Sequence, residues 1–249
     1  VPFLKEANDF TGRRHEVLSV LNQLRTAFKN GTSNYLLISG PAGIGKSYLS
    51  SYVASFFKTK LKPKKILLIT YRFKPNHLLG WSFSDFLKNI YEMLIVQIKN
   101  LDNNSIYEQN DFKFNGNDNN DIKAIRNLIN SLSELSYKIL FIIDGIDELV
   151  KYGTKFNSEC IKSLSSHSTI WLFTGRMEPE VKQFAEQLSC IEIFKHGLDK
   201  MSENDIRKMI LHKIDIIRPL REMLIKLDSE QINENESPEL VKNLFVSKV

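Results

Sequence analysis

The sequence predicts an α/β fold in which a five-stranded parallel sheet is flanked by helices. Three observations support this fold class. Five apolar segments of strand length alternate with segments whose apolar residues recur at helical spacing. A glycine-rich segment joins the first expected strand to a helix, and an aspartate directly follows the third expected strand. In a parallel sheet both features lie at the carboxyl edge, where such sheets bind their ligands.

The expected elements follow one another in a regular order. Apolar runs predict strands at 35–39, 66–71, 137–143, 169–174 and 190–194. Helical periodicity predicts helices at 17–28, 46–57, 85–99, 122–135, 158–165, 178–188, 205–227 and 238–246. We expect Gly31 to close the first helix, Ser84 to cap the third, and Pro219 to kink or end the seventh. The segment 100–121, rich in Asn and Asp, is expected to be a long mobile loop.

Length and composition indicate one large globular domain in a reducing, cytoplasmic setting. The 249 residues are 42% hydrophobic and 25% charged, which is ordinary for a soluble protein. No apolar run reaches membrane-spanning length and the first residues lack the basic-then-apolar order of a signal peptide, so we expect no membrane partner. Two cysteines, Cys160 and Cys190, are too few for a disulfide framework or a structural zinc site. A first residue of Val1 rather than Met suggests a fragment or a processed chain.

The segment from Gly40 to Ser47 carries the strongest chemical signal. Its sequence, Gly-Pro-Ala-Gly-Ile-Gly-Lys-Ser, fits the pattern G-x-x-x-x-G-K-[ST] of the phosphate-binding loop, or P-loop. Glycines let backbone amides curl around a phosphate, Lys46 would reach the outer phosphates, and the Ser47 hydroxyl would ligate Mg²⁺. The expected ligands are therefore ATP or ADP with Mg²⁺. The candidate nucleotide-binding residues here are Gly40, Pro41, Ala42, Gly43, Ile44, Gly45, Lys46, Ser47 and Tyr48.

A second acidic segment complements the P-loop. The hydrophobic strand that ends before Asp144 would place this carboxylate where it holds Mg²⁺ through water. Asp147 and Glu148 follow, and one of them could orient or deprotonate an attacking water. We prefer Asp147, because an i, i+3 step from Asp144 puts both carboxylates on one side if a helical turn follows the strand. Glu148 stays the alternative.

The positive charge of the chain says little about its partners. The net charge of +5 is weak evidence for an anionic partner, because a nucleotide pocket itself needs positive charge. Lysines concentrate only between 58 and 65, which we interpret as a solvated connection between a helix and a strand. No interleaved aromatic residues accompany these lysines, and we therefore do not expect a nucleic-acid partner.

The segment Asp144-Gly-Ile-Asp-Glu-Leu149 resembles the magnesium-binding motif of NACHT domains, which belong to the STAND class of signalling ATPases related to the AAA+ proteins. A Phe-x-Gly-Arg segment typical of that family is similar to 10–13, which implies that Phe10, Thr11, Gly12 and Arg13 contact the adenine. The segment 174–176 is similar to the family's first sensor, with Gly175 in place of Ser and Met177 in place of Pro. The resemblance implies that Arg176 senses or stabilises the γ-phosphate.

This resemblance covers residues 10–215 and implies a division of the chain. Residues 1–33 would form an adenine-side segment and helix, 34–197 the nucleotide-binding core, and 198–249 the start of a C-terminal helical lid. The family's Gly-x-Pro segment and winged helix have no counterpart here. The resemblance therefore implies a core taken from a longer chain that carries effector and sensor domains.

The function expected from these features is a switch that binds ATP and hydrolyses it slowly. The switch would be a monomer with ADP bound and would self-associate with ATP bound. Proteins of the resembled family act in innate immunity, cell death and antiphage defence. One alternative is an AAA+ ATPase of the origin-recognition or helicase-loader type, which would act on nucleic acid. Another alternative is a nucleotide kinase or a similar P-loop enzyme, although the sequence shows no signature of an acceptor pocket.

Overall fold

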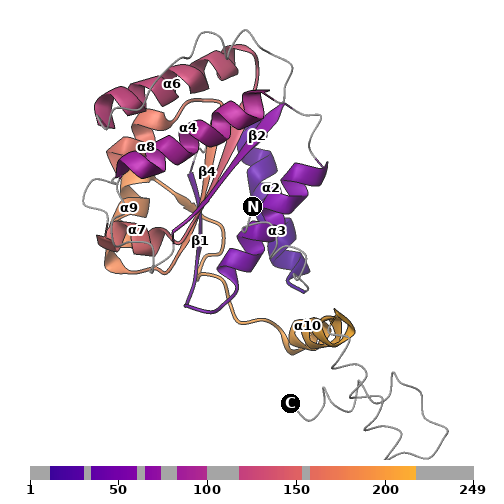
Figure 1. Cartoon of the computed structure of the whole chain (residues 1–249). Coiled ribbons are helices and arrows are strands. Elements are labelled where there is room, and N and C mark those ends of the chain that lie inside the picture. The colour runs from indigo at the N-terminus through magenta and orange to yellow at the C-terminus, as the bar shows by residue number, and fades with distance from the viewer. Residues whose placement is uncertain are drawn as a thin grey trace, which may run out of the picture.

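The computed structural model describes residues 12–30, 35–60, 65–73, 83–99, 118–152 and 158–216. Five parallel strands form one sheet in the order β2-β3-β4-β1-β5 (Figure 1). The strands are β1 (Tyr35–Ser39), β2 (Ile66–Arg72), β3 (Lys138–Asp144), β4 (Thr169–Gly175) and β5 (Ile191–Glu192). The predicted five-stranded parallel sheet flanked by helices is confirmed.

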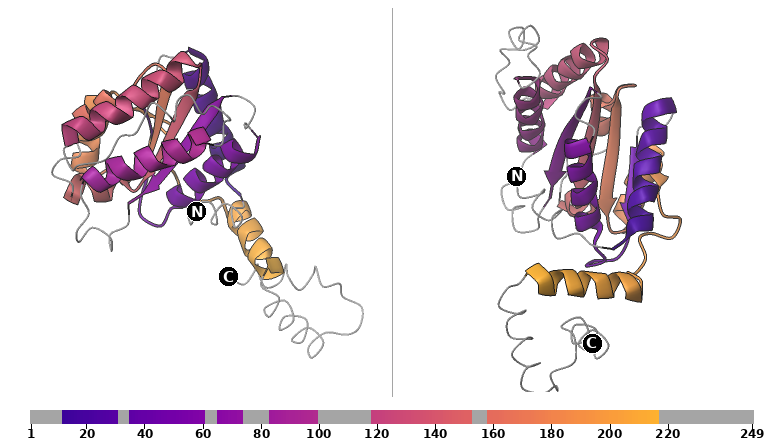
Figure 2. Two further views of the ribbon diagram at one scale, coloured as in Figure 1. Left: turned by 45° about the horizontal axis from the view of Figure 1, so that its top comes forward. Right: turned by 90° about the vertical axis from the view of Figure 1, so that its right-hand side faces the viewer.

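Helices cover both faces of the sheet, so that it lies in the middle of three layers (Figure 2, right). One face carries α2 (Arg14–Asn30) and α3 (Lys46–Lys60). The other face carries α4 (Phe83–Lys99), α6 (Asp118–Glu134), α7 (Ile146–Tyr152), α8 (Ser158–Leu164) and α9 (Pro179–Leu188). The last described helix, α10 (Glu203–Ile216), lies beyond the end of the sheet (Figure 1).

The middle residues of β3 and β4 are apolar because both faces of these strands are buried. In β3, Leu140 and Ile142 pack into the core beneath α2 and α3, whereas Ile139, Phe141 and Ile143 pack into the core on the opposite face. The rings of Phe141 and Trp171 stack across β3 and β4 with their centroids 4.0 Å apart. This two-sided burial makes the sheet a rigid platform for the loops at its carboxyl edge.

Several expected boundaries were wrong by a few residues. Helix α4 begins at Phe83, one residue before the expected cap, because the Phe83 side chain packs into the core. Ser84 is therefore inside the helix, and its hydroxyl donates to Asp121 Oδ2 at 3.5 Å. Residues 118–121, expected to belong to the mobile loop, form the first turn of α6, where Asp118 and Asp121 complement the helix dipole.

The fifth strand is also shorter than expected. The strand itself comprises only Ile191 and Glu192. The chain stays beside β1 after it, because the N–H groups of Ile193 and Leu198 donate to the carbonyl oxygens of Leu37 and Ser39, at 2.9 and 2.6 Å, and Gly197 between them adopts a φ of 79°. The helix expected at 205–227 begins at Glu203 and is described to Ile216. The expected roles of Gly31 and Pro219 and the helix at 238–246 lie outside the described residues. Within the described residues, no helix has both the length and the apolar character that crossing a membrane requires.

Candidate nucleotide-binding site

The register of the sheet gathers the predicted site at its carboxyl edge. Ser39, which precedes the P-loop, lies opposite Gly175 of β4. Asp144 lies between two neighbours, opposite Thr174 of β4 on one side and Arg72 of β2 on the other. The P-loop, the aspartate and the segment before Arg176 therefore come together although they are far apart in the sequence.

The P-loop has the backbone that its sequence predicts. Gly43 and Gly45 adopt φ values of 72° and 99°, a region that residues with a Cβ rarely occupy. Helix α3 begins at Lys46, directly after these glycines, so that its amino end faces the loop. Pro41 and Ala42 are exposed at the tip, as is Tyr48, whose side chain is 44% exposed on the first turn of the helix.

Lys46 folds back over its own loop. Its ammonium group donates to the carbonyl oxygens of Gly40 and Pro41, each at 2.7 Å. Burial lowers the pKa of Lys46, the charges of Asp147 and Asp144 oppose that shift, and the charge of Arg176 adds to it. The two carboxylates that sequence reasoning placed on one side thus both act on the P-loop lysine.

Ser47 and Asp144 meet as the magnesium hypothesis requires. The Ser47 hydroxyl donates to Asp144 Oδ1 at 3.1 Å, and the Thr174 hydroxyl donates to the same oxygen. Asp144 is only 2% exposed, and its second oxygen, Oδ2, accepts from Arg72 Nε at 2.5 Å. Oxygen donors of this kind suit Mg²⁺. In the described ranges, no group of three or more His, Cys, Asp or Glu side chains is arranged so that it could hold a metal ion by itself.

Asp147 and Glu148 are both engaged by Arg176. They lie in the first turn of α7, which supplies the helical turn expected after the strand. Arg176 Nε lies 2.5 Å from Asp147 Oδ2, and its terminal nitrogen lies 2.7 Å from Glu148 Oε1. The hydrogen bond that Arg176 donates to Asp147 is the main cause of a raised pKa of Arg176. Glu178 lies farther away, at 3.6 Å.

The glycine at position 175 has a steric reason. A Cβ at Gly175 would lie 2.6 Å from Ile146 Cγ2 and 3.2 Å from Asp147 Oδ1. Glycine therefore allows α7 to approach the end of β4 and Asp147 to reach Arg176. Gly175 stands where the resembled sensor motif has serine, and it lies at the point where α7 approaches the end of β4.

Arg13 is buried beneath the P-loop, at 1% exposure. Its guanidinium donates to the carbonyl oxygens of Ile44 and Asp199, both at 2.8 Å, and pairs with Glu16 at 2.9 Å. Gly12 lies against α10, where an added Cβ would be 2.9 Å from Asp205 Cβ. The amino-terminal segment thus joins the P-loop to the chain that leads into α10. Phe10 and Thr11 lie outside the described residues.

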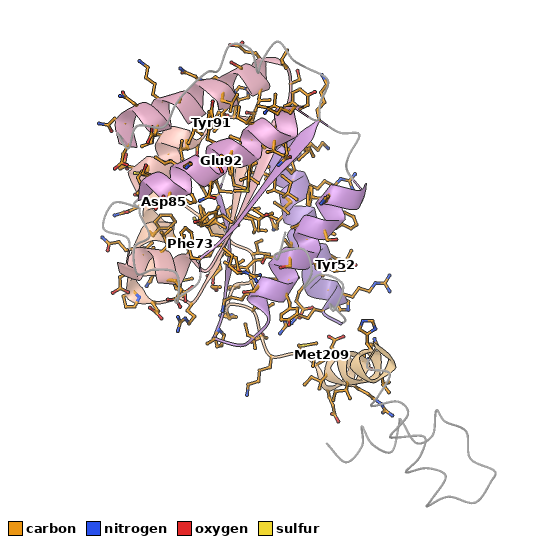
Figure 3. The ribbon with its side chains drawn as sticks, viewed as in Figure 1. Tyr52, Phe73, Asp85, Tyr91, Glu92 and Met209 are labelled. Atoms are coloured by element: carbon orange, nitrogen blue, oxygen red, sulfur yellow. The ribbon has the colours of Figure 1, made fainter. Side chains whose placement is uncertain are left out.

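Arg72 is the site residue that sequence reasoning missed. It is the last residue of β2, and the next residue, Phe73 (Figure 3), donates its N–H to the Asp144 carbonyl at 2.9 Å. A basic residue at the carboxyl end of an apolar strand was the available signal. This signal places Arg72 in the site only if β2 is the neighbour of β3, and the local sequence does not predict that strand order.

Comparisons with known proteins agree with this architecture. A family model described as "Nephrocystin 3, N-terminal" matches residues 18–176, which is more than half of the chain. A search among curated proteins finds no match.

Two solved structures from Aeropyrum pernix have a similar fold. The ORC1 protein in complex with DNA is 14% identical with a TM-score of 0.52, and the ORC2 protein in its ADPNP-ADP complexes is 12% identical with a TM-score of 0.57. The matches cover 96% and 95% of this chain but only 59% and 67% of those proteins. The fold is thus that of P-loop AAA+ ATPase domains, and the chain belongs to the nephrocystin 3 N-terminal family.

Proposed function

We propose that this protein is an ATP-dependent switch of the STAND class, which hydrolyses ATP slowly and self-associates in its ATP-bound form. The observation that supports this proposal most is the contact of one guanidinium, Arg176, with both Asp147 and Glu148. A γ-phosphate would compete with these carboxylates for Arg176. The presence or absence of that phosphate would then change how α7 contacts the end of β4, which is the kind of bias that a nucleotide switch needs.

The residues of the P-loop would bind the nucleotide. Lys46 would leave the carbonyl oxygens of Gly40 and Pro41 and pair with the outer phosphates, for which the backbone amides of the loop supply further donors. Ser47 and Asp144 would hold Mg²⁺, which neutralises phosphate charge when it is bound. The buried Arg13 would keep the loop in place from below through Ile44.

Hydrolysis would be slow because the carboxylates needed for it are neutralised. A general base must accept a proton from water, and a carboxylate bound to a guanidinium is a weaker acceptor. Asp147 is the preferred water-positioning residue and Glu148 the alternative. Either residue would act only after Arg176 has moved to the γ-phosphate.

The resemblance to NACHT domains supports the wider setting of this proposal. In that setting residues 1–33 form the adenine side, 34–197 the core and 198–249 part of a lid. The contacts of Gly12 with Asp205 and of Arg13 with Asp199 are consistent with a lid that adjoins the adenine side. Effector and sensor domains of a longer cytoplasmic chain would turn the switch into an immune, cell-death or antiphage response.

A second candidate function is that of an origin-recognition or helicase-loader ATPase. The observation that favours it is the similarity of fold, over nearly the whole chain, to an ORC1 protein whose structure contains DNA. The identity of 14% supports the fold alone, so DNA binding is a separate hypothesis for this chain.

Two measurements test the proposals. Equilibrium titration with fluorescent ATP and ADP should show saturable binding, and sedimentation velocity of the full-length protein should show larger species with ATP than with ADP. A protein that stays monomeric with both nucleotides at every concentration would contradict the switch. Binding to duplex DNA that weakens steeply as salt rises would favour the second candidate.

A further inference from the structure

The carboxylate expected to serve Mg²⁺ already has a cation beside it. Arg72 Nε lies 2.5 Å from Asp144 Oδ2, and the Asp144 side chain is 2% exposed. The two residues are register partners in neighbouring parallel strands, so the backbone of the sheet itself sets them side by side. Arg72 is 15% exposed, which shields this pair from water and strengthens its electrostatic effect.

The guanidinium is held from a second direction. Its terminal nitrogen donates to Ser51 Oγ at 3.2 Å and to the Ser47 carbonyl oxygen at 3.4 Å, both on α3. Arg72 therefore connects β2, β3 and the helix that follows the P-loop. A positive charge fixed by three elements cannot easily swing away when an ion approaches.

The two oxygens of Asp144 are divided between different partners. Oδ1 accepts from the hydroxyls of Ser47 and Thr174, whereas Oδ2 accepts from Arg72. The orientation of the carboxylate is thus supported by hydroxyl groups without Arg72. The particular contribution of Arg72 is its charge, which neutralises Asp144 at Oδ2, the oxygen that does not accept from the Ser47 hydroxyl.

We propose that Arg72 is a resident counter-cation of Asp144, which lowers the affinity of the site for Mg²⁺ and lets the protein bind nucleotide with little dependence on this ion. The inference rests on the proposed nucleotide-binding function. A positive charge next to the ion's carboxylate repels the ion and reduces the negative charge available to it. The same charge offsets part of the phosphate charge when no ion is present.

The test compares nucleotide affinity with and without the ion. The dissociation constant of fluorescent mant-ADP for the full chain is measured in excess EDTA and in millimolar Mg²⁺. The ratio compared below is the value in EDTA divided by the value in Mg²⁺, so that a larger ratio means a stronger dependence on the ion. For the unchanged protein we expect a ratio within about 3-fold of unity, and for Arg72→Gln a rise of roughly 10-fold or more, the usual size of effects from partners of metal ligands. Arg72→Lys keeps the charge and should restore a ratio close to that of the unchanged protein.

The outcomes separate the two levels of the proposal. An unchanged protein that binds mant-ADP in neither condition would refute the nucleotide-binding function itself. Binding with an unchanged ratio in Arg72→Gln would overturn the counter-cation, and a smaller ratio would show instead that Arg72 holds Asp144 for the ion. If Arg72→Gln does not fold, the ratio of the unchanged protein still tests the proposal. A ratio above about 30-fold in that protein would contradict a resident cation that lowers the affinity for Mg²⁺. Lys162→Gln, in an exposed ion pair on α8, is the matched control.

Discussion

Arg176 Nε lies 2.5 Å from Asp147 Oδ2, and this contact joins the end of β4 to the first turn of α7. If Arg176 leaves Asp147 to meet a γ-phosphate, its removal should affect ATP and ADP differently. We expect Arg176→Ala to weaken ATP binding by about 10-fold, the size of one hydrogen bond to a charged group, and to leave ADP binding within about 3-fold. Parallel titrations with both nucleotides measure this. An equal loss for both would assign Arg176 a structural role only.

Lys46→Ala should weaken nucleotide binding severely, by at least about 10-fold, because the charge-assisted hydrogen bonds to the outer phosphates are lost. The same titration measures the change. Lys58→Ala, exposed on the same helix, is the control and should bind like the unchanged protein. Unaltered affinity and turnover in Lys46→Ala would contradict the site.

The roles of the two acidic residues can be separated by isosteric substitutions. Asp147→Asn is expected to slow ATP hydrolysis by roughly 10²-fold, in the usual range for loss of a general base, with binding largely intact. Phosphate release under single-turnover conditions measures the rate. A large loss in Glu148→Gln together with normal turnover in Asp147→Asn would transfer the role to Glu148.

Gly175→Ala should destabilise the fold by about 1–3 kcal/mol, the usual range for overpacking, because its Cβ would lie 2.6 Å from Ile146 Cγ2. Denaturant unfolding gives the change in free energy. Ile146→Ala removes the opposing methyl groups, so the double variant should lose less stability than the sum of the two single variants. Strict additivity would mean that these two side chains do not meet.

Burial raises the pKa of the Cys190 thiol from 9.0 to about 12. Between these values the native state keeps a proton that the unfolded state releases, so stability falls as pH rises through this window. The unchanged protein should therefore lose more unfolding free energy between pH 8 and pH 10.5 than Cys190→Ala does. Urea unfolding at both pH values measures the difference, and equal losses would show that the thiol is not desolvated in the native state.

The local features of this protein could be read from its sequence. Each strand, the P-loop and the group of carboxylates at 144, 147 and 148 is encoded by residues that lie close together in the sequence, because apolar periodicity, glycine and charge act locally. Prediction was weakest at the ends of elements, where packing in the tertiary structure decides the boundary. Phe83 extends α4 because its side chain is buried, and β5 comprises only the two residues that pair with β1.

The sequence by itself thus determined a nucleotide-type loop on a parallel sheet, together with the acidic residues that follow its third strand. Only the tertiary structure decided which charges meet. Arg72 and Asp144 are 72 positions apart and Arg13 and Asp199 are 186 apart, and neither pair follows from any local pattern. Such pairs depend on the strand order β2-β3-β4-β1-β5, which is set by the burial of whole faces of the sheet.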